Sequence, residues 1–250
     1  MILVQLSEIF KKYILKEQFR PTIAGIFLNP FYFGRLVIYR NILRYAGKIK
    51  GDTIDVGCGS KPYESLFNTT KYIGLDLAKS GHNHSTSKID FFYNGLYMPF
   101  DSDTFDSAVC FEVLQVVFNP EQFLKETYRI VKPGANLLFT VPFFWDEHEQ
   151  PHDFARYTSF GLNHMFTDAG YKIIESKKLL CDMRLFALLT NNYIYKVVRK
   201  LIPSRFSLLL ILPLTSVINL FGTLLYFLPR NADMYFGNIM LLQKPEIRNG

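Results

Sequence analysis

The chain has 250 residues, of which 49% are hydrophobic and 16% aromatic, and its formal net charge is +6. This composition excludes an intrinsically disordered chain and suits one α/β domain with additions, or at most two small domains. The three cysteines, Cys58, Cys110 and Cys181, are widely spaced, which argues against a disulfide framework and favours a reducing compartment.

The charge is unevenly distributed along the chain. Residues 1–50 hold nine basic residues (Lys or Arg) and two acidic ones (Asp or Glu). Residues 51–175 hold nine basic and seventeen acidic residues, and residues 176–206 hold seven basic residues and one acidic residue. An acidic centre between basic flanks argues against a nucleic-acid-binding domain. The flanks are both basic and apolar, which favours contact with an anionic membrane surface.

The first 50 residues are predicted to be a helical extension. Apolar residues recur at helical spacing within residues 1–20, and a second helix is predicted to end near Gly47. The first segment is not typical of a signal peptide, because its charges follow the apolar stretch. It is predicted either to pack on the domain or to lie on a membrane surface.

Strand and helix patterns alternate across residues 51–180. Helices are predicted at 61–67, at 120–131 before the stop signal Pro133-Gly134, and between the N-cap Thr158 and Gly170. Strands are predicted at 53–56, 72–77, 88–94, 107–111, 135–142 and 171–176, with a last strand in the segment 233–250, near 235–243. This order predicts an α/β fold with a doubly wound, Rossmann-like, seven-stranded and mostly parallel sheet, which binds ligands at the carboxyl ends of its strands.

The stretch TIDVGCGSKPY, residues 53–63, is the first candidate binding site. Asp55 ends an apolar run, and Gly57 and Gly59 would let a ligand approach the backbone beside a predicted helix N-terminus. A dinucleotide fingerprint requires a third glycine where this chain has Pro62, so a nicotinamide dehydrogenase is disfavoured. A carboxylate before the first glycine suits a ligand with an ammonium group, such as S-adenosylmethionine. A plain strand–helix turn is the alternative.

Two further positions fit the same ligand. Asp76 ends the second strand, where an acid can bind a ribose diol, although it would also serve as a helix N-cap. Asn94-Gly95 follows the third strand, where a side chain could reach an adenine edge, although the pair would also form an ordinary turn.

Five stretches together resemble class I S-adenosylmethionine-dependent methyltransferases, most of all the small type-11 branch. They are DVGCGSKPY, YIGLDL, MPFDSDTFDSAVCFEVLQ, LKETYRIVKPGANLLFTVPF and HEQPHDFARYTSFGLNHMFTDAGY. The resemblance implies that the glycine loop holds the methionine part of the cofactor, that the strand-two acid binds the ribose, and that the residue after strand three contacts adenine. The cofactor-binding residues expected from it are Asp55, Gly57, Cys58, Gly59, Asp76, Leu77, Asn94, Gly95 and Phe111.

The chain departs from the family pattern at two places. Asn94 stands where Asp is common, and its amide oxygen could still accept from the adenine amino group. Gln115-Val116 stands where Glu-His is common, which removes a histidine from the active-site region. The second departure is the support for an alternative, a non-catalytic S-adenosylmethionine-binding or scaffold protein.

The segment PFFWDEHEQPHDFARYTSFG, residues 142–161, is the candidate acceptor site. A hydroxyl acceptor calls for a general base, and the candidate catalytic residues are His148, His152 and Asp153. No metal is expected, because Pro151 between the two histidines disfavours a regular helix. The alternative for Asp153 is a pairing with Arg156 that staples the loop. His82 and His84, in a polar loop, are expected to be solvated.

The string H-x-x-P-x-D-x-x-R-Y-T in that segment resembles family members associated with polysaccharide and lipopolysaccharide biosynthesis. The resemblance implies O-methylation of a sugar hydroxyl on a small-molecule or lipid-linked acceptor. The rival acceptor is an isoprenoid quinone or another lipid.

The predicted insertion 181–232 contains an uncharged stretch at residues 206–229. It is long enough to span a bilayer, but a span would leave the last strand on the far side from the others. It is therefore predicted to be a peripheral membrane hairpin that bends at Pro213 and Gly222, or an insertion buried against the domain or a homodimer partner. With the basic amphipathic stretch before it, it predicts membrane contact through 1–20 and 185–229 for a cytoplasmic protein, at the inner face of the plasma membrane.

Overall fold

The computed structural model of this protein describes residues 13–78 and 88–246, apart from the side chains of Ser204 and Arg205. It divides the chain into two compact units, Asn41–Lys178 with Gly237–Gly250, and Met1–Arg40 with Leu179–Phe236. Residues 1–12 of the predicted N-terminal helix, and the loop with His82 and His84, lie outside the described residues.

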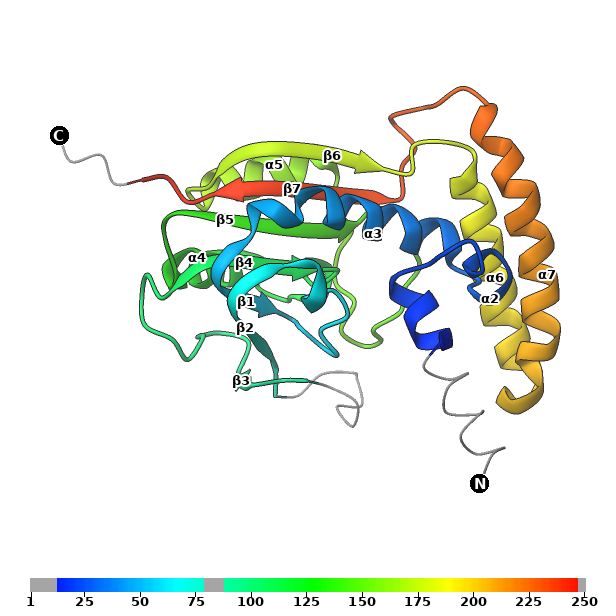
Figure 1. The fold of residues 1–250 in the computed structure, drawn as a ribbon, viewed down its shortest axis with the longest axis horizontal. Coiled ribbons are helices and arrows are strands. Elements are labelled where there is room, and N and C mark those ends of the chain that lie inside the picture. The colour runs from blue at the N-terminus through cyan, green and yellow to red at the C-terminus, as the bar shows by residue number, and fades with distance from the viewer. Residues whose placement is uncertain (1–12, 79–87, 247–250) are drawn as a thin grey trace. The chain divides into compact units, whose positions relative to one another are not determined.

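The first unit is built on a seven-stranded sheet with the order β3-β2-β1-β4-β5-β7-β6 (Figure 1). Strands β1 to β5 pair in parallel, and β7 runs antiparallel to β5. The predicted mostly parallel sheet is therefore confirmed. The strands are β1 Lys50–Val56, β2 Asn68–Leu77, β3 Phe91–Tyr93, β4 Phe105–Phe111, β5 Val131–Pro142, β6 Lys172–Leu179 and β7 Gly237–Gln243.

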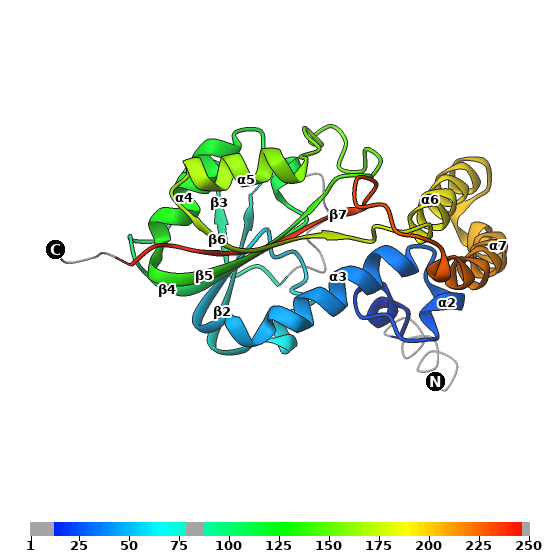
Figure 2. The same ribbon diagram turned by 90° about the horizontal axis from the view of Figure 1, so that it is seen from above.

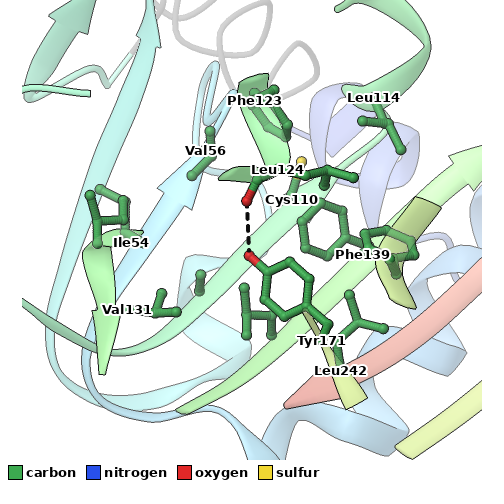
Figure 3. Packing of buried hydrophobic residues seen from close by; sticks show 14 of the residues in the cluster. Ile54, Val56, Cys110, Leu114, Phe123, Leu124, Val131, Phe139, Tyr171 and Leu242 are labelled. Carbon is green, nitrogen blue, oxygen red and sulfur yellow. Dashed lines mark hydrogen bonds between the residues drawn. The ribbon is translucent and has the colours of Figure 1, made fainter. Parts of the chain in front are cut away.

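The core lies around the central strands. Consecutive residues of β4, β5 and β7 are buried, which is why these strands appear in the sequence as continuous apolar runs. Two helices of this unit are α4, Pro120–Ile130, and α5, Ser159–Asp168, and the side chains of Asn119 and Thr158 cap their N-termini, as predicted for Thr158. Figure 3 shows the packing, in which Tyr171 donates a hydrogen bond from its hydroxyl to Leu124 O at 3.4 Å.

Two predictions about this unit are wrong. The segment 61–67 forms only the 3₁₀ turn η2, Glu64–Leu66, because Lys61 takes a positive φ of 52° and its side chain is buried. The pair Pro133-Gly134 does not stop α4, which ends at Ile130, but lies inside β5. The glycine turn is therefore followed by a compact turn instead of a helix N-terminus.

The second unit is helical. Residues 13–19 are helical, and the helices that follow are α2 Gly25–Leu28, α3 Tyr32–Tyr45, α6 Arg184–Leu201 and α7 Ser204–Leu224 with the 3₁₀ turn η5 Leu225–Phe227. The end of α3 from Asn41 on and the 3₁₀ turn η1 Ala46–Lys48 belong to the first unit. Figure 2 shows α6 and α7 side by side. They run antiparallel, since a Cβ on Gly222 would lie 3.1 Å from Ala187 Cβ and Asn191 bonds to Asn219.

The predicted bend within residues 206–229 is also wrong. Helix α7 continues through both Pro213 and Gly222. Gly222 instead allows close packing, because a Cβ there would stand 2.5 Å from the Phe33 ring. The uncharged stretch is therefore one long helix, packed against α6.

Candidate functional site

The glycine turn after β1 has the geometry of a ligand cradle. Gly57 and Gly59 both take positive φ values, 78° and 48°, which favour glycine. A Cβ on Gly57 would stand 2.3 Å from Val113 Cγ2, whereas a Cβ on Gly59 would meet nothing within 4 Å. The turn is thus closed on the Gly57 side and open beside Gly59, where a side chain would fill the space.

Cys58, between the two glycines, points into the protein. Burial, followed by the negative charge of Asp55, raises the pKa of its thiol well above the ordinary value. A protonated, buried thiol is a packing group and not a nucleophile. Cys58 therefore takes part in the turn through its backbone.

Asp55 is buried at the carboxyl end of β1 and bonded within the protein. Its Oδ2 accepts a hydrogen bond from the Tyr72 hydroxyl at 2.8 Å. Burial raises the pKa of Asp55 to about 7, and the bond from Tyr72 and the charge of Lys61 oppose that rise only in part. A nearby cation would therefore find a carboxyl group that ionises near neutral pH.

Asp76 joins the end of β2 to the glycine turn. Its Oδ2 accepts from Gly59 N at 2.9 Å, and its Oδ1 accepts from Leu77 N at 2.8 Å. The predicted ribose and methionine sites therefore adjoin. Leu77 also lies against Gly95, where a Cβ would stand 3.3 Å from Leu77 Cδ2, so the turn after β3 borders the same place.

Asn94 holds its own turn together. Its Oδ1 accepts from Leu96 N at 2.9 Å and from Tyr97 N at 3.0 Å, and Gly95 takes a φ of 84°. This is the ordinary turn given above as the alternative. The Asn94 Oδ1 atom expected to accept from the adenine amino group therefore already accepts two backbone hydrogen bonds.

Aromatic side chains surround Phe111, at the end of β4. Its ring centroid lies 5.3 Å from that of Tyr63 and 6.2 Å from that of Phe67, and Phe67 stacks on Tyr72 at 5.9 Å. Only Phe111 was expected here. The other rings come from the segment wrongly predicted as a helix and from the first half of β2, so their spacing along the chain gave no signal.

Lys61 is a functional-region residue that the sequence patterns did not single out. Its buried Nζ pairs with Asp90 and donates to Tyr72 O at 3.2 Å, and Asp90 also accepts from Gly74 N at 2.7 Å. Burial alone would raise the pKa of Asp90, but these bonds outweigh it and lower that pKa. Lys61 thus fastens the glycine turn to β2.

The candidate acceptor segment is organised around Asp153, whose side chain is 2% exposed. Arg156 binds it with two hydrogen bonds, at 2.5 and 2.7 Å, and also donates to Asp146 O. Burial would raise the pKa of Asp153, but the bonds from Arg156 and from His148 N outweigh it and lower that pKa. The predicted staple between Asp153 and Arg156 is confirmed.

His148 is brought to the same carboxylate. Its backbone N donates to Asp153 Oδ2 at 3.0 Å, and its ring Nδ1 lies 3.3 Å from that oxygen and also 3.3 Å from Asp146 O, its hydrogen-bond partner. When Nδ1–H donates to Asp146 O, Nε2 is the basic atom of the neutral ring. His152 is exposed, and its described contact is with the Phe154 ring, at 6.2 Å between centroids. The structure therefore unites Asp153 with His148 and leaves His152 outside the pair.

The acceptor segment and the glycine turn meet through the residues after β4. Phe154 N and Ala155 N donate to Gln115 O at 2.9 and 3.1 Å, in the 3₁₀ turn η4, Leu114–Val116, which begins next to the Val113 that packs on Gly57. The buried Gln115 side chain donates to Glu112 O at 2.6 Å. The Gln115 backbone oxygen thus holds the acceptor segment, and its side chain ties η4 to the residue after β4.

Within residues 13–78 and 88–246, no group of three or more His, Cys, Asp or Glu side chains could hold a metal ion. An open hollow of about 560 Å³ lies between β3 and the start of β4 and contains none of the expected site residues. Its lining residues are Phe91, Met98, Pro99, Phe100, Asp101 and Thr104.

Comparison with known sequences gives a consistent assignment. Residues 31–176 match the sequence model of a family described as methyltransferase domain. A probable S-adenosylmethionine-dependent methyltransferase of Mycolicibacterium smegmatis is 27% identical over 48% of this chain and 49% of its own length. A mitochondrial ubiquinone biosynthesis O-methyltransferase of Dictyostelium discoideum is 29% identical over 36% of this chain and 35% of its own. The chain thus spans about half or less of these relatives.

Solved structures share the fold at low identity. A phosphoethanolamine N-methyltransferase of Haemonchus contortus, in complex with S-adenosyl-L-methionine, has a TM-score of 0.54 at 16% identity and covers 92% of this chain and 59% of that one. The cyclase SpnF has a TM-score of 0.54 at 17% identity, and the match covers 82% of this chain and 79% of the cyclase chain. At this identity the likeness concerns the fold.

Proposed function

This chain belongs to the methyltransferase-domain family, and we propose that it is a class I S-adenosylmethionine-dependent methyltransferase that methylates a hydroxyl oxygen, on a sugar or a lipid-linked glycan. The family assignment favours this activity over the two alternatives, a scaffold protein and a nicotinamide dehydrogenase. The observation that carries the proposal is the pairing of His148 with the buried Asp153.

The described residues fit the cofactor. S-adenosylmethionine supplies an electrophilic methyl carbon on a positively charged sulfur. The space beside Gly59 would admit its methionine part, and Asp76, next to that space, offers carboxylate oxygens to a ribose. Asp55, with its pKa near 7, would ionise in favour of a nearby ammonium group.

His148 would act as the general base. Nε2 takes the proton of the acceptor hydroxyl while the oxygen bonds to the methyl carbon and the carbon–sulfur bond breaks. The products are a methyl ether and S-adenosylhomocysteine. Asp146 O accepts from Nδ1, the Asp153 carboxylate beside the same ring nitrogen stabilises the imidazolium, and Arg156 keeps Asp153 ionised. Such a base contributes about 10²–10⁴-fold to the rate.

The sugar is favoured by the composition of the acceptor segment. Glu147 and Glu149 flank His148 in the sequence, and their carboxylates can accept hydrogen bonds from sugar hydroxyls. The string H-x-x-P-x-D-x-x-R-Y-T points the same way, through its resemblance to polysaccharide-biosynthesis members.

The test is an acceptor screen with methyl-labelled S-adenosylmethionine, analysed by mass spectrometry. Cofactor binding is measured first by calorimetry, with NAD as the negative control. We expect label on the hydroxyl of a free or polyprenyl-linked sugar. Label that appears only on nitrogen or carbon acceptors would refute O-methylation, and a folded protein that binds no S-adenosylmethionine would refute the cofactor site.

A quinone precursor is the second candidate acceptor, supported by the Dictyostelium relative and by the aromatic residues around Phe111. A phenol, with a pKa near 10, needs less help from a base than a sugar hydroxyl. Replacement of His148 by Ala should therefore slow transfer to a phenol much less than transfer to a sugar. If a quinone precursor is labelled and no sugar is, the quinone precursor is the acceptor.

A further inference from the structure

Helix α7 buries its polar face and exposes its apolar face, which is the reverse of a helix on the surface of a soluble protein. The polar side chains Ser207, Thr215 and Asn219 are buried, in line with Ile211 at four-residue intervals. The residues between them are apolar except Ser216 and are exposed or partly exposed, and no charged residue occurs in residues 206–229. A helix on the surface of a soluble protein normally buries its apolar face instead.

The buried polar face is satisfied within its own unit. Asn219 accepts a hydrogen bond from Asn191 Nδ2 at 2.9 Å and donates to Ile26 O and Asn29 O at 3.0 and 3.1 Å. Thr215 donates to Ile211 O at 2.8 Å. Polar groups that face the protein and pair there are characteristic of helices whose other side meets lipid.

The outer face is broad and apolar. Leu209 is 75% exposed, Val217 67%, Phe221 60% and Leu224 62%. The apolar stretch Phe206–Phe227 within α7 and η5 is 22 residues long and has a mean hydropathy of 2.1 in its most apolar window, which makes it long and apolar enough to be a candidate membrane span. The remaining large exposed side chains are Phe206, Leu208, Leu210, Leu214, Leu220, Tyr226, Phe227 and Leu228.

Cations border this face at one end of the hairpin. Lys196, Arg199 and Lys200 lie in the last turns of α6 and are exposed. Because α6 and α7 are antiparallel, this end of α6 lies at the start of α7. Basic side chains beside an apolar face match the headgroups and acyl chains of an anionic lipid surface.

We propose that α7 docks in the plane of an anionic membrane, with Leu209, Val217 and Phe221 inserted at the acyl boundary and the α6 cations at the phosphates. A span is disfavoured, because α6 would have to cross with α7 and carry the three cations through the hydrocarbon to the far surface. A second copy of the chain fits less well, because a helix–helix seam covers a narrower stripe than this face.

The test is flotation of the full chain with vesicles of phosphatidylcholine, alone or mixed with phosphatidylglycerol. We expect flotation with the anionic vesicles that declines as salt is raised. The double variant Leu209→Gln/Val217→Gln should lower the partition coefficient at least tenfold. Substitution of Gln for Lys196, Arg199 and Lys200 together should remove the preference for anionic vesicles.

The matched control is Phe160→Gln with Ile174→Gln, two exposed apolar side chains outside the helical unit, which should leave flotation unchanged. Wild-type protein that stays at the bottom of the gradient with anionic vesicles at low salt overturns the proposal. So does a stable dimer in light scattering that Val217→Gln dissociates, which would identify a second copy as the occupant. The assay needs no methyl transfer, so its outcome is independent of the acceptor.

Discussion

Gly57 and Val113 are so close that a Cβ on Gly57 would stand 2.3 Å from Val113 Cγ2. This contact links the two halves of the candidate site, because the residues just after Val113 hold the acceptor segment through Gln115 O. A change on one side is therefore expected to reach the other.

Gly57→Ala should damage both folding and cofactor binding. The positive φ and the clash with Val113 together should cost about 2–4 kcal/mol of unfolding free energy, and the affinity for S-adenosylmethionine should fall at least tenfold. Thermal unfolding and calorimetry measure the two effects.

Gly59→Ala is the matched control. It meets no atom within 4 Å, so its cost should be about 1–2 kcal/mol from backbone strain, with a loss of affinity because the new Cβ occupies the cradle. Wild-type affinity in both variants would contradict the assignment of the cradle.

His148→Gln should lower kcat by about 10²–10⁴-fold while the dissociation constant of S-adenosylmethionine stays within about twofold, because a general base acts on the acceptor and not on the cofactor. His152→Gln, an exposed neighbour outside the Asp153 pair, should keep near-normal kcat. Steady-state kinetics with the identified acceptor measures both. Equal losses in the two variants would count against the assignment of His148.

Asp55 should make the ligand-free protein less stable as the pH rises from about 4 to about 7. Its folded pKa of about 7 lies above its ordinary 3.8, so over this range the folded state holds a proton that the unfolded state has lost. The stabilisation, up to about 4 kcal/mol, is complete below pH 4 and gone above pH 7.

Asp55→Asn removes this titration and keeps an oxygen that can accept from Tyr72. Urea unfolding at several pH values should show that the unfolding free energy of the variant increases relative to that of the wild type as the pH rises, by about 4 kcal/mol in total. Parallel stability curves for the two proteins would show that Asp55 does not titrate in this range.

Asn219→Ala should destabilise the helical unit by about 2–4 kcal/mol, because it leaves the part-buried Ile26 O without its donor and one N–H of the buried Asn191 side chain without its acceptor. Val217→Ala, two residues away on the exposed face, should change the unfolding free energy in solution by less than about 0.5 kcal/mol. Chemical denaturation without lipid measures both. A larger cost for Val217 than for Asn219 would contradict the reversed polarity of α7.

The strands could be predicted from the sequence because the central ones are buried on both faces and therefore form unbroken apolar runs. The helix predicted at residues 61–67 does not form, although the pattern of apolar residues fits a helix. The buried Lys61 side chain pairs with Asp90 and fixes a turn there instead. That pairing joins residues 29 positions apart, and no periodicity shows it.

The candidate site was predictable where its partners are close in sequence. Asp153 and Arg156 lie three residues apart, and their pairing was expected. The bond from Tyr72 to Asp55 and the contact of Val113 with Gly57 depend on the register of neighbouring strands, which local spacing does not specify. The burial of the polar face of α7 could not be predicted from the sequence, because the spacing of its few polar residues does not show whether they point toward the protein or toward solvent.

Strand β7 lies between β5 and β6, yet it follows α6 and α7 in the order of the described elements. Its pairing joins Pro142 to Gly237, so β5 stays exposed on one edge until residues 237–243 have left the ribosome. Helices α6 and α7 emerge first, and the nascent chain therefore presents its most apolar helix while its sheet is still open. Such long-range closure is slow and leaves an unpaired edge prone to association. Early capture of α7 by a membrane would shield the growing chain during that interval.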